Sequence, residues 1–152
     1  MEEMRIGDMP YNVREKAGKK IEDGVVAFLK SKHYKVRRPK PSIFKEGNYI
    51  KNHTPDIYVV GKSIIDVKMG RNLRIDLLDA YQQWYVEYLG NSWEIPMYIA
   101  CYFKDMEGVA LYSFNALYTA DKTEWRNGEW SDGNKYYTIP KDFLRVGWIP
   151  LK

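Results

Sequence analysis

The stretch His53–Lys68, HTPDIYVVGKSIIDVK, decides how the rest of the sequence is interpreted. Residues 57–60 and 63–67 are short apolar runs rich in β-branched side chains, which are typical of strands. Gly61-Lys62 between them is typical of a turn. The stretch therefore predicts a β-hairpin with a two-residue turn.

Three polar side chains of this hairpin can act together chemically. Asp66 and Lys68 lie two residues apart on one strand, so both should project from the same face of the sheet. Asp56, which follows Pro55, begins the other strand. Two carboxylates and an ammonium group at one place can hold a hard divalent cation together with a phosphate oxygen. The pattern predicts metal-assisted chemistry on a phosphate.

The predicted hairpin contains one geometric conflict. With a strict two-residue turn, Asp56 pairs opposite Val67 and points away from Asp66. A shared site needs either an odd-length loop with a bulge, or Asp56 lying just outside the ladder. Departures of this kind are common at position 56, because it follows a proline at the start of a strand.

Pro55-Asp56, nine intervening residues and then Asp66-Val67-Lys68 resemble the motif of the PD-(D/E)xK nuclease superfamily. This superfamily includes many restriction enzymes, archaeal Holliday-junction resolvases and phage nucleases. The resemblance implies an α/β (α+β) fold with a restriction-endonuclease-like core, in which helices flank a mixed central β-sheet. The core covers about residues 12–103. An aromatic-rich C-terminal extension, about residues 104–152, completes a single predicted domain over residues 1–152.

Length and composition set the wider bounds. A chain of 152 residues with 45% hydrophobic and 29% charged residues is ordinary for one globular domain. The net charge of +4 suits an anionic partner. Because the sequence has no secretory signal and no apolar segment of membrane-spanning length, we expect an intracellular, cytoplasmic protein without a membrane partner. The single cysteine, Cys101, predicts a buried free thiol and leaves almost no material for a zinc site.

A first helix is predicted from Asn12, a capping residue, to about Lys32. Glu22 lies at the edge of the apolar stripe of this helix, in line with Gly18, where an unpaired carboxylate costs free energy. In the nuclease superfamily, an acidic residue on a first helix commonly completes the metal site. The resemblance therefore implies this role for Glu22. The alternative is a surface glutamate paired with a lysine along the helix.

A basic run separates this helix from the hairpin. Residues 30–51 contain eight basic residues against one acid, and 34–38 predict a first strand. Since the run leads directly to the motif, it can grip a phosphate backbone; a solvated charge run is the alternative. The candidate nucleic-acid contacts in this region are Arg37, Arg38, Lys40, Lys51 and His53.

A second helix is predicted from about Asp76 to Leu89, with Tyr81 in its apolar stripe. Gln82 and Gln83 resemble the glutamine of a helix found in several branches of the superfamily, where it helps to position the scissile phosphate or water. The sequence does not separate the two glutamines, and a solvated polar face is the alternative for each.

The remaining residues predict further strands. Residues 95–103 and 108–117 are two strands around an acidic turn, and the first should be central because both its faces are apolar. Residues 126–129 and 131–134 are typical of hairpin tips. We expect the C-terminal extension to cover the sheet edge and pack into the core. A dimer contact or a substrate contact is the alternative.

These observations predict a metal-dependent nuclease, an endonuclease or exonuclease that hydrolyses phosphodiester bonds in nucleic acid, in particular DNA. By the resemblance, Asp56, Asp66 and Glu22 bind Mg²⁺ or Mn²⁺, the carbonyl of Val67 adds a ligand, and Lys68 orients water and offsets charge on the phosphate. The size of the chain and the Glu22 pattern favour a small resolvase-like or phage-type enzyme. Branched or recombination intermediates, a phage or viral origin and a homodimer are included in this expectation.

Two other classes of function stay open. One is a catalytically inactive nucleic-acid-binding or regulatory protein with the same fold, although the complete set of Asp, Asp, Lys and Glu argues against loss of catalysis. The other is an unrelated small α/β interaction protein, such as an inhibitor, with a chance motif. A Mg²⁺- or Mn²⁺-dependent nicking assay separates these classes from a nuclease.

Overall fold

The computed structural model describes residues 11–38, 56–76, 78–82 and 95–151, with the backbone alone for residues 11–15. Residues 75–76 and 78–82 are helical. None of the helices within these ranges combines the length and the apolar character needed to cross a membrane. The other elements are α1 (Tyr11–Ser31), β1 (Val36–Arg37), β2 (Ile57–Val59), β3 (Ser63–Lys68), β4 (Asn72–Arg74), β5 (Met97–Phe103), the 3₁₀ helix η3 (Lys104–Met106), β6 (Gly108–Ser113), α4 (Phe114–Thr119), β7 (Asn127–Glu129), β8 (Lys135–Thr138) and β9 (Gly147–Pro150).

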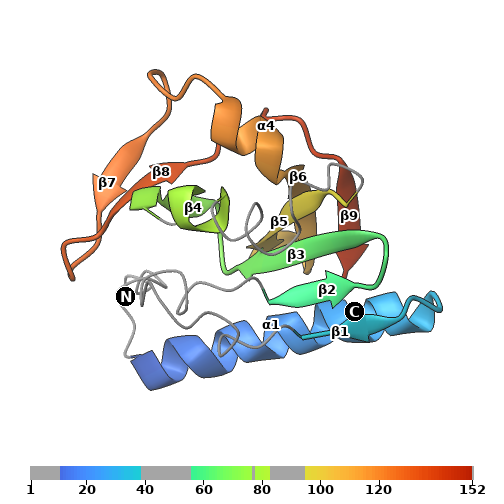
Figure 1. The fold of residues 1–152 in the computed structure, drawn as a ribbon. Helices are drawn as coiled ribbons and strands as arrows, with labels where there is room; N and C mark the ends of the chain where they lie inside the picture. Colours follow the sequence, from blue (N-terminus) through green and yellow to red (C-terminus); the bar gives the residue numbers. More distant parts are fainter. Residues whose placement is uncertain (1–10, 39–55, 77, 83–94, 152) are drawn as a thin grey trace, which may run out of the picture.

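The strands form two sheets. The larger has six strands in the order β1-β2-β3-β5-β6-β9, and the smaller has three in the order β4-β8-β7. In the larger sheet β3 and β5 are parallel, and the other neighbours are antiparallel. The predicted α+β class with a mixed sheet is therefore confirmed. Figure 1 shows α1 along one face of the larger sheet and α4 beyond the other.

The larger sheet buries apolar side chains on both faces, because successive residues of a strand point to opposite sides. Ile65 packs in a cluster with Val25 and Leu29 of α1, whereas Ile64 packs in the cluster that contains Tyr81 and α4. The residues of β5 alternate between the two clusters in the same way. The predicted central position of β5 is therefore confirmed, and the thiol of Cys101 is buried and free, as expected.

The first helix agrees with the sequence pattern and ends at a defined motif. The amide of Tyr34 donates to the carbonyl of Leu29 at 3.1 Å, and that of His33 donates to Lys30 at 2.9 Å. These bonds form a Schellman motif around His33, whose φ of 68° lies in the left-handed region. The helix stops there because this residue reverses the backbone direction, and β1 follows.

Two predictions about the second half of the chain were wrong. The strand predicted over 108–117 ends at Ser113, whose hydroxyl accepts a hydrogen bond from the amide of Ala116 at 3.2 Å and caps α4. Residues 126–129 are not a hairpin tip, because 127–129 form β7, which pairs with β8. The tip predicted at 131–134 is confirmed as the connection between these strands.

The C-terminal extension covers the sheet edge, as predicted. Its strand β9 pairs with β6, and β8 pairs with both β7 and β4. Trp125 and Ile139 are buried in the cluster that contains Tyr81. The extension is also attached just after β3, since Arg71 Nη1 donates to the carbonyl of Ile139 at 2.6 Å and its own carbonyl accepts from the Ile139 amide at 2.9 Å.

The close approach of β6 to β9 gives a test of this arrangement. A Cβ atom on Gly108 would lie 2.7 Å from the carbonyl oxygen of Ile149 and closer still to the ring of Trp148. We expect Gly108→Ala to lower the free energy of unfolding by about 1–3 kcal/mol, measured by urea denaturation. Gly70→Ala is the control, because nothing lies within 4 Å of its added Cβ. A Gly108 variant as stable as the control would contradict the described packing.

Candidate active site

The candidate site lies where β3 extends beyond β2. On one side, β5 pairs with β3 as far as Lys68. On the other side, β2 pairs only as far as Ile65, opposite Ile57. Asp66, Val67 and Lys68 therefore have one paired edge and one edge that β2 does not cover.

The hairpin loop has three residues, 60–62, so the predicted two-residue turn is wrong. The amide of Lys62 donates to the carbonyl of Val59 at 2.9 Å, and Gly61 has a φ of 73°, which glycine adopts without steric cost. The extra residue changes the register by one. If the ladder were extended, Asp56 would lie opposite Asp66, which is the relation that a shared site requires.

Asp56 lies just before β2 and contacts the uncovered edge of β3. Its Oδ2 accepts a hydrogen bond from the amide of Val67 at 2.9 Å. This carboxylate takes the place of a backbone acceptor from a neighbouring strand, so the amide is satisfied where the ladder has ended. The contact also fixes the Asp56 side chain beside Asp66.

A hollow of about 280 Å³ opens between α1 and this edge. We call it the acidic hollow. It brings together two of the three predicted metal-binding carboxylates, Glu22 and Asp56, and the backbone that carries the predicted carbonyl ligand. Its described lining residues are Gly18, Lys19, Glu22, Arg38, Asp56 and Val67.

Arg38 reaches the acidic hollow from the end of β1 and pairs with acids of α1. Its guanidinium lies 2.6 Å from the carboxylate of Asp23 and 3.5 Å from that of Glu22. Both pairs are partly exposed, and such pairs contribute little to stability. Arg38 thus partly neutralises the rim of the hollow. Its predicted contact with phosphate stays a prediction, as does that of the exposed Arg37.

Asp66 and Lys68 form an ion pair on the face of the sheet opposite α1. Asp66 is 2% exposed, and Lys68 Nζ lies 2.8 Å from its Oδ2. Despite this short distance, Oδ2 has no well-aligned hydrogen bond, so the pair is held by charge attraction. Lys68 Nζ also donates to the hydroxyl of Tyr81 at 2.7 Å and lies 5.0 Å from its ring centre.

The carboxylates of the acidic hollow bind protons more tightly than isolated acids. Burial, and then the negative charge of Asp66, raise the pKa of Asp56 to about 9, against the opposing effect of the Val67 amide. Burial also raises the pKa of Glu22, and Arg38 partly opposes this shift. Burial is the main cause of both shifts and neighbouring acids add to it, so a bound cation would favour the ionised form of each carboxyl group.

Lys68 and Tyr81, on the face of the sheet opposite α1, keep their protons. Burial lowers the pKa of Lys68, but the charge of Asp66 and the contact with Tyr81 outweigh it, so the net shift is upward. Burial raises the pKa of Tyr81 as well. Lys68 is therefore an ammonium ion, and Tyr81 a neutral phenol, at neutral pH. Burial raises the pKa of Cys101 to about 12, so its thiol is unreactive.

The donor set suits a hard divalent cation in its chemistry. Every group that the nuclease resemblance assigns to a metal is an oxygen donor, the type that Mg²⁺ and Mn²⁺ prefer. Asp66 Oδ2 is buried without an aligned hydrogen bond, so it has acceptor capacity left. Within the described ranges, however, no three His, Cys, Asp or Glu side chains are grouped closely enough to hold a metal ion. Glu22, Asp56 and Asp66 are thus near one another, but their carboxylates do not surround a common position for a metal ion.

Several of the other predicted nucleic-acid contacts lie outside the residues that the structure describes. Gln82 is half-buried on the helical segment 78–82, next to Tyr81. Lys40, Lys51, His53 and Gln83 lie outside the described residues. Sequence reasoning missed the role of Tyr81, which it placed in the apolar stripe. The available signal was the hydroxyl itself, because a buried tyrosine usually finds a hydrogen-bond partner.

Sequence comparison assigns the chain to no protein family. No protein-family model matches it, and no curated protein shows a significant match.

The raised pKa of Asp56 predicts how stability depends on pH. Between about pH 4 and pH 9, the unfolded chain releases a proton that folded Asp56 retains. The free energy of unfolding should therefore fall as the pH rises through this window, by at most about 1.4 kcal/mol per pH unit from this group. We expect Asp56→Asn to flatten the profile in urea denaturation without added metal. Asp142→Asn, at an exposed acid outside the hollow, should leave it unchanged. Parallel profiles for the parent and Asp56→Asn would contradict the assigned shift.

Proposed function

We propose that the chain is a metal-dependent nuclease of the PD-(D/E)xK type that hydrolyses phosphodiester bonds in nucleic acid, with DNA as the favoured substrate. The register of the β2–β3 hairpin carries the proposal. Its three-residue loop directs Asp56 toward the position opposite Asp66, and Glu22 lines the same hollow as Asp56. Asp66 in turn pairs with Lys68 on the next position of the same face of β3.

The topology supports the same proposal. Apart from β4, which belongs to the smaller sheet, the elements follow the order helix, strand, hairpin, helix, strand, and β5 returns parallel to β3 (Figure 1). Helices lie on both faces of the mixed sheet. This arrangement is what a restriction-endonuclease-like core would have, with α1 supplying the acid and β3 the aspartate and the lysine.

Glu22, Asp56, Asp66 and the carbonyl of Val67 are the groups that would hold Mg²⁺ or Mn²⁺. When bound, such an ion polarises a phosphate oxygen and lowers the pKa of a water molecule. Asp56 and Glu22 line the hollow, so they are open to solvent-borne ligands. Because burial raises the pKa of both carboxyl groups, protons compete with a metal ion for them, and occupancy should rise with pH.

Lys68 acts in this proposal as a fixed positive charge. Its ammonium has three N–H donors, one of which is donated to Tyr81, and Nζ lies 2.8 Å from Asp66 Oδ2 without an aligned hydrogen bond. Among the described contacts, donor capacity stays available for a phosphate oxygen or an attacking water. Since Lys68 keeps its proton at neutral pH, it stabilises negative charge on the phosphate and does not abstract a proton.

A nucleic-acid-binding protein without catalysis is the second candidate. The Asp66–Lys68 ion pair favours it, because the lysine occupies the charge that a metal would otherwise balance. The absence of a closely grouped set of three acids among the described residues favours it too.

A cleavage assay decides between these candidates. We expect the parent protein to cut plasmid, branched DNA or single-stranded nucleic acid with Mn²⁺ or Mg²⁺ and not with EDTA. Asp56→Asn and Glu22→Gln should each lower the rate, Asp56→Asn by at least about 100-fold, as when one electrostatic contributor is removed. These two acids are chosen because removing Asp66 would leave Lys68 without the carboxylate of its ion pair, which could unfold the protein. Asp142→Asn is the matched control.

The same variants give a readout that does not require turnover. Millimolar Mn²⁺ should stabilise the parent by about 1 kcal/mol in thermal unfolding, and Asp56→Asn should remove most of this stabilisation. If folded Asp56→Asn still cleaved nucleic acid, the proposal that Asp56 belongs to the active site would be wrong. Absence of cleavage and of a metal response in the parent would favour the binding protein.

Tyr81 is predicted to position Lys68. Tyr81→Phe removes the hydroxyl that accepts from Nζ and keeps the ring, so kcat should fall by about tenfold, the scale of one hydrogen bond to a charged group. KM for nucleic acid should change little, because Tyr81 contacts the lysine and not the substrate. Tyr118→Phe is the control, since its hydroxyl donates to Asp79 instead. Equal kcat in the two variants would show that the hydroxyl does not serve catalysis.

A further inference from the structure

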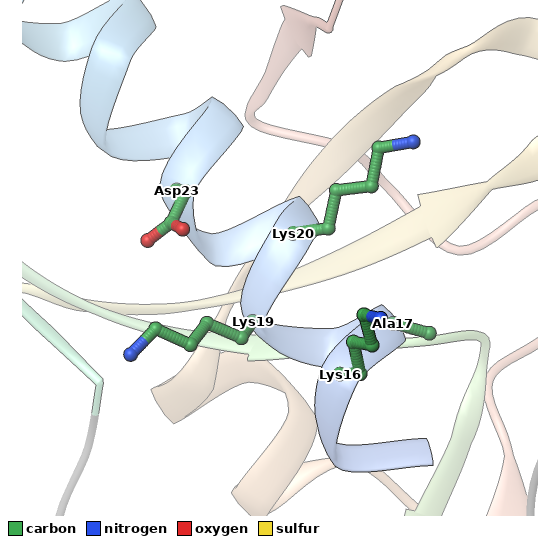
Figure 2. A pocket seen from close by; sticks show the side chains of 5 residues that line it. All are labelled: Lys16, Ala17, Lys19, Lys20 and Asp23. Carbon is green, nitrogen blue, oxygen red and sulfur yellow. The ribbon is translucent and has the colours of Figure 1, made fainter. Parts of the chain in front are cut away.

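A second and larger hollow, of about 660 Å³, lies on the outer face of α1. We call it the lysine hollow. Its described lining residues are Lys16, Ala17, Lys19, Lys20 and Asp23 (Figure 2). Figure 2 shows Lys19 and Asp23 extending to one side of the helix and Lys20 to the other. The hollow therefore presents positive charge across the width of α1.

The lysines of this hollow form no ion pair within the described part of the chain, although Lys19 is near enough to Glu22 to lower the pKa of that acid. Lys16, Lys19 and Lys20 are exposed. Asp23 is the acid that lines the hollow, and its carboxylate is held by Arg38 at 2.6 Å. The lysines are thus available to an external anion.

The lysine hollow adjoins the acidic hollow. Lys19 lines both, so the two share one wall on α1. Lys16 and Lys20 are one helical turn apart, about 6 Å along the axis, on the N-terminal side of Glu22. A chain of phosphates lying on these lysines would reach Glu22 and Asp56 by passing Lys19.

We propose that Lys16, Lys19 and Lys20 bind the phosphate backbone of nucleic acid and direct the strand into the acidic hollow. The claim that the strand is directed toward Glu22 and Asp56 rests on the proposed function, whereas the claim that the lysines bind the phosphate backbone does not. Lysines act on phosphates as point charges, so this surface should bind without reading sequence.

An anionic membrane fits the same face less well. A helix that lies on a membrane inserts an apolar face between the headgroups. The apolar face of α1 is occupied, because Ile21, Val25 and Leu29 are buried against the sheet. Ala17 is the apolar residue among those lining the lysine hollow. The lysine hollow therefore attracts ligands mainly through its positive charge, which favours a polyanion.

The test is metal-free binding to fluorescein-labelled duplex and single-stranded DNA, measured by anisotropy in EDTA over a range of salt concentrations. K16Q/K19Q/K20Q is compared with K62Q/K135Q/K141Q, which removes the same charge from exposed lysines that line neither hollow. We expect the first variant to raise Kd at least tenfold at low salt and the control to stay within about threefold. On duplex DNA, a plot of the logarithm of the association constant against the logarithm of the salt concentration has a negative slope. This slope should become less steep by about 0.9 for each phosphate that the variant no longer neutralises.

The outcomes separate this proposal from the nuclease. Lysine-dependent binding by a parent that cuts nothing would support the binding surface and remove the nuclease. Normal Kd and normal cleavage in K16Q/K19Q/K20Q would overturn the binding surface and leave the nuclease intact. An equal rise of Kd in both triple variants would overturn it too, since net charge alone would then explain binding. Binding to vesicles that contain anionic phospholipid, if it depended on the same lysines and were as strong as binding to DNA, would also overturn the proposal that this surface is for nucleic acid.

Discussion

The incomplete pairing of β3 is the constraint on which the candidate site depends. On one edge β5 fixes the strand through Lys68, and on the other β2 leaves after three residue pairs. A buried amide without an acceptor costs about 1–3 kcal/mol, so the amide of Val67 needs a partner at the point where β2 ends. Asp56 supplies it through Oδ2. The hydrogen bond that completes the backbone therefore also places a carboxylate beside Asp66.

The same strand carries an ion pair into a largely apolar layer. Asp66 and Lys68 share a face with Ile64, next to the buried Ile99 and Cys101 of β5. Removing charges from water is unfavourable, and removal of one member of a buried pair typically costs about 3–5 kcal/mol. Tyr81 reduces this cost by accepting a hydrogen bond from Lys68. The residues most suited to chemistry are thus also tied to the stability of the sheet.

Local pattern was enough to predict much of this fold. The apolar spacing on α1 and the β-branched runs at 57–60 and 63–67 predicted the helix and the hairpin strands, because both signals come from neighbouring residues. The turn was misjudged because Val60 is β-branched and extends the strand pattern, whereas Gly61 determines the loop. The apolar residues on both sides of Ser113 also concealed the end of β6, although Ser113 is a good capping residue.

The candidate site was less predictable because its contacts join distant parts of the chain. Sequence grouped Glu22, Asp56, Asp66 and Lys68 through a resemblance, and this grouping stays a prediction. The β2–β3 ladder ends at Ile57 and Ile65, and Asp56 and Asp66 would lie opposite each other only if it were extended. The sequence did not reveal that Arg38 pairs with α1, or that Tyr81 holds Lys68. Ion pairs of this kind depend on how elements pack, and no local periodicity encodes them.

The last described strand has a kinetic consequence. β9 is the outer neighbour of β6, and the side chain of Leu151 lies against Gly24 of α1, across almost the whole described length of the chain. Contacts of such long sequence separation form late, because a large loop must close before they stabilise anything. Until β9 docks, β6 presents an unpaired edge that can pair with another molecule. The speed of this final docking, relative to encounters between partly folded chains, would set the yield of correctly folded protein.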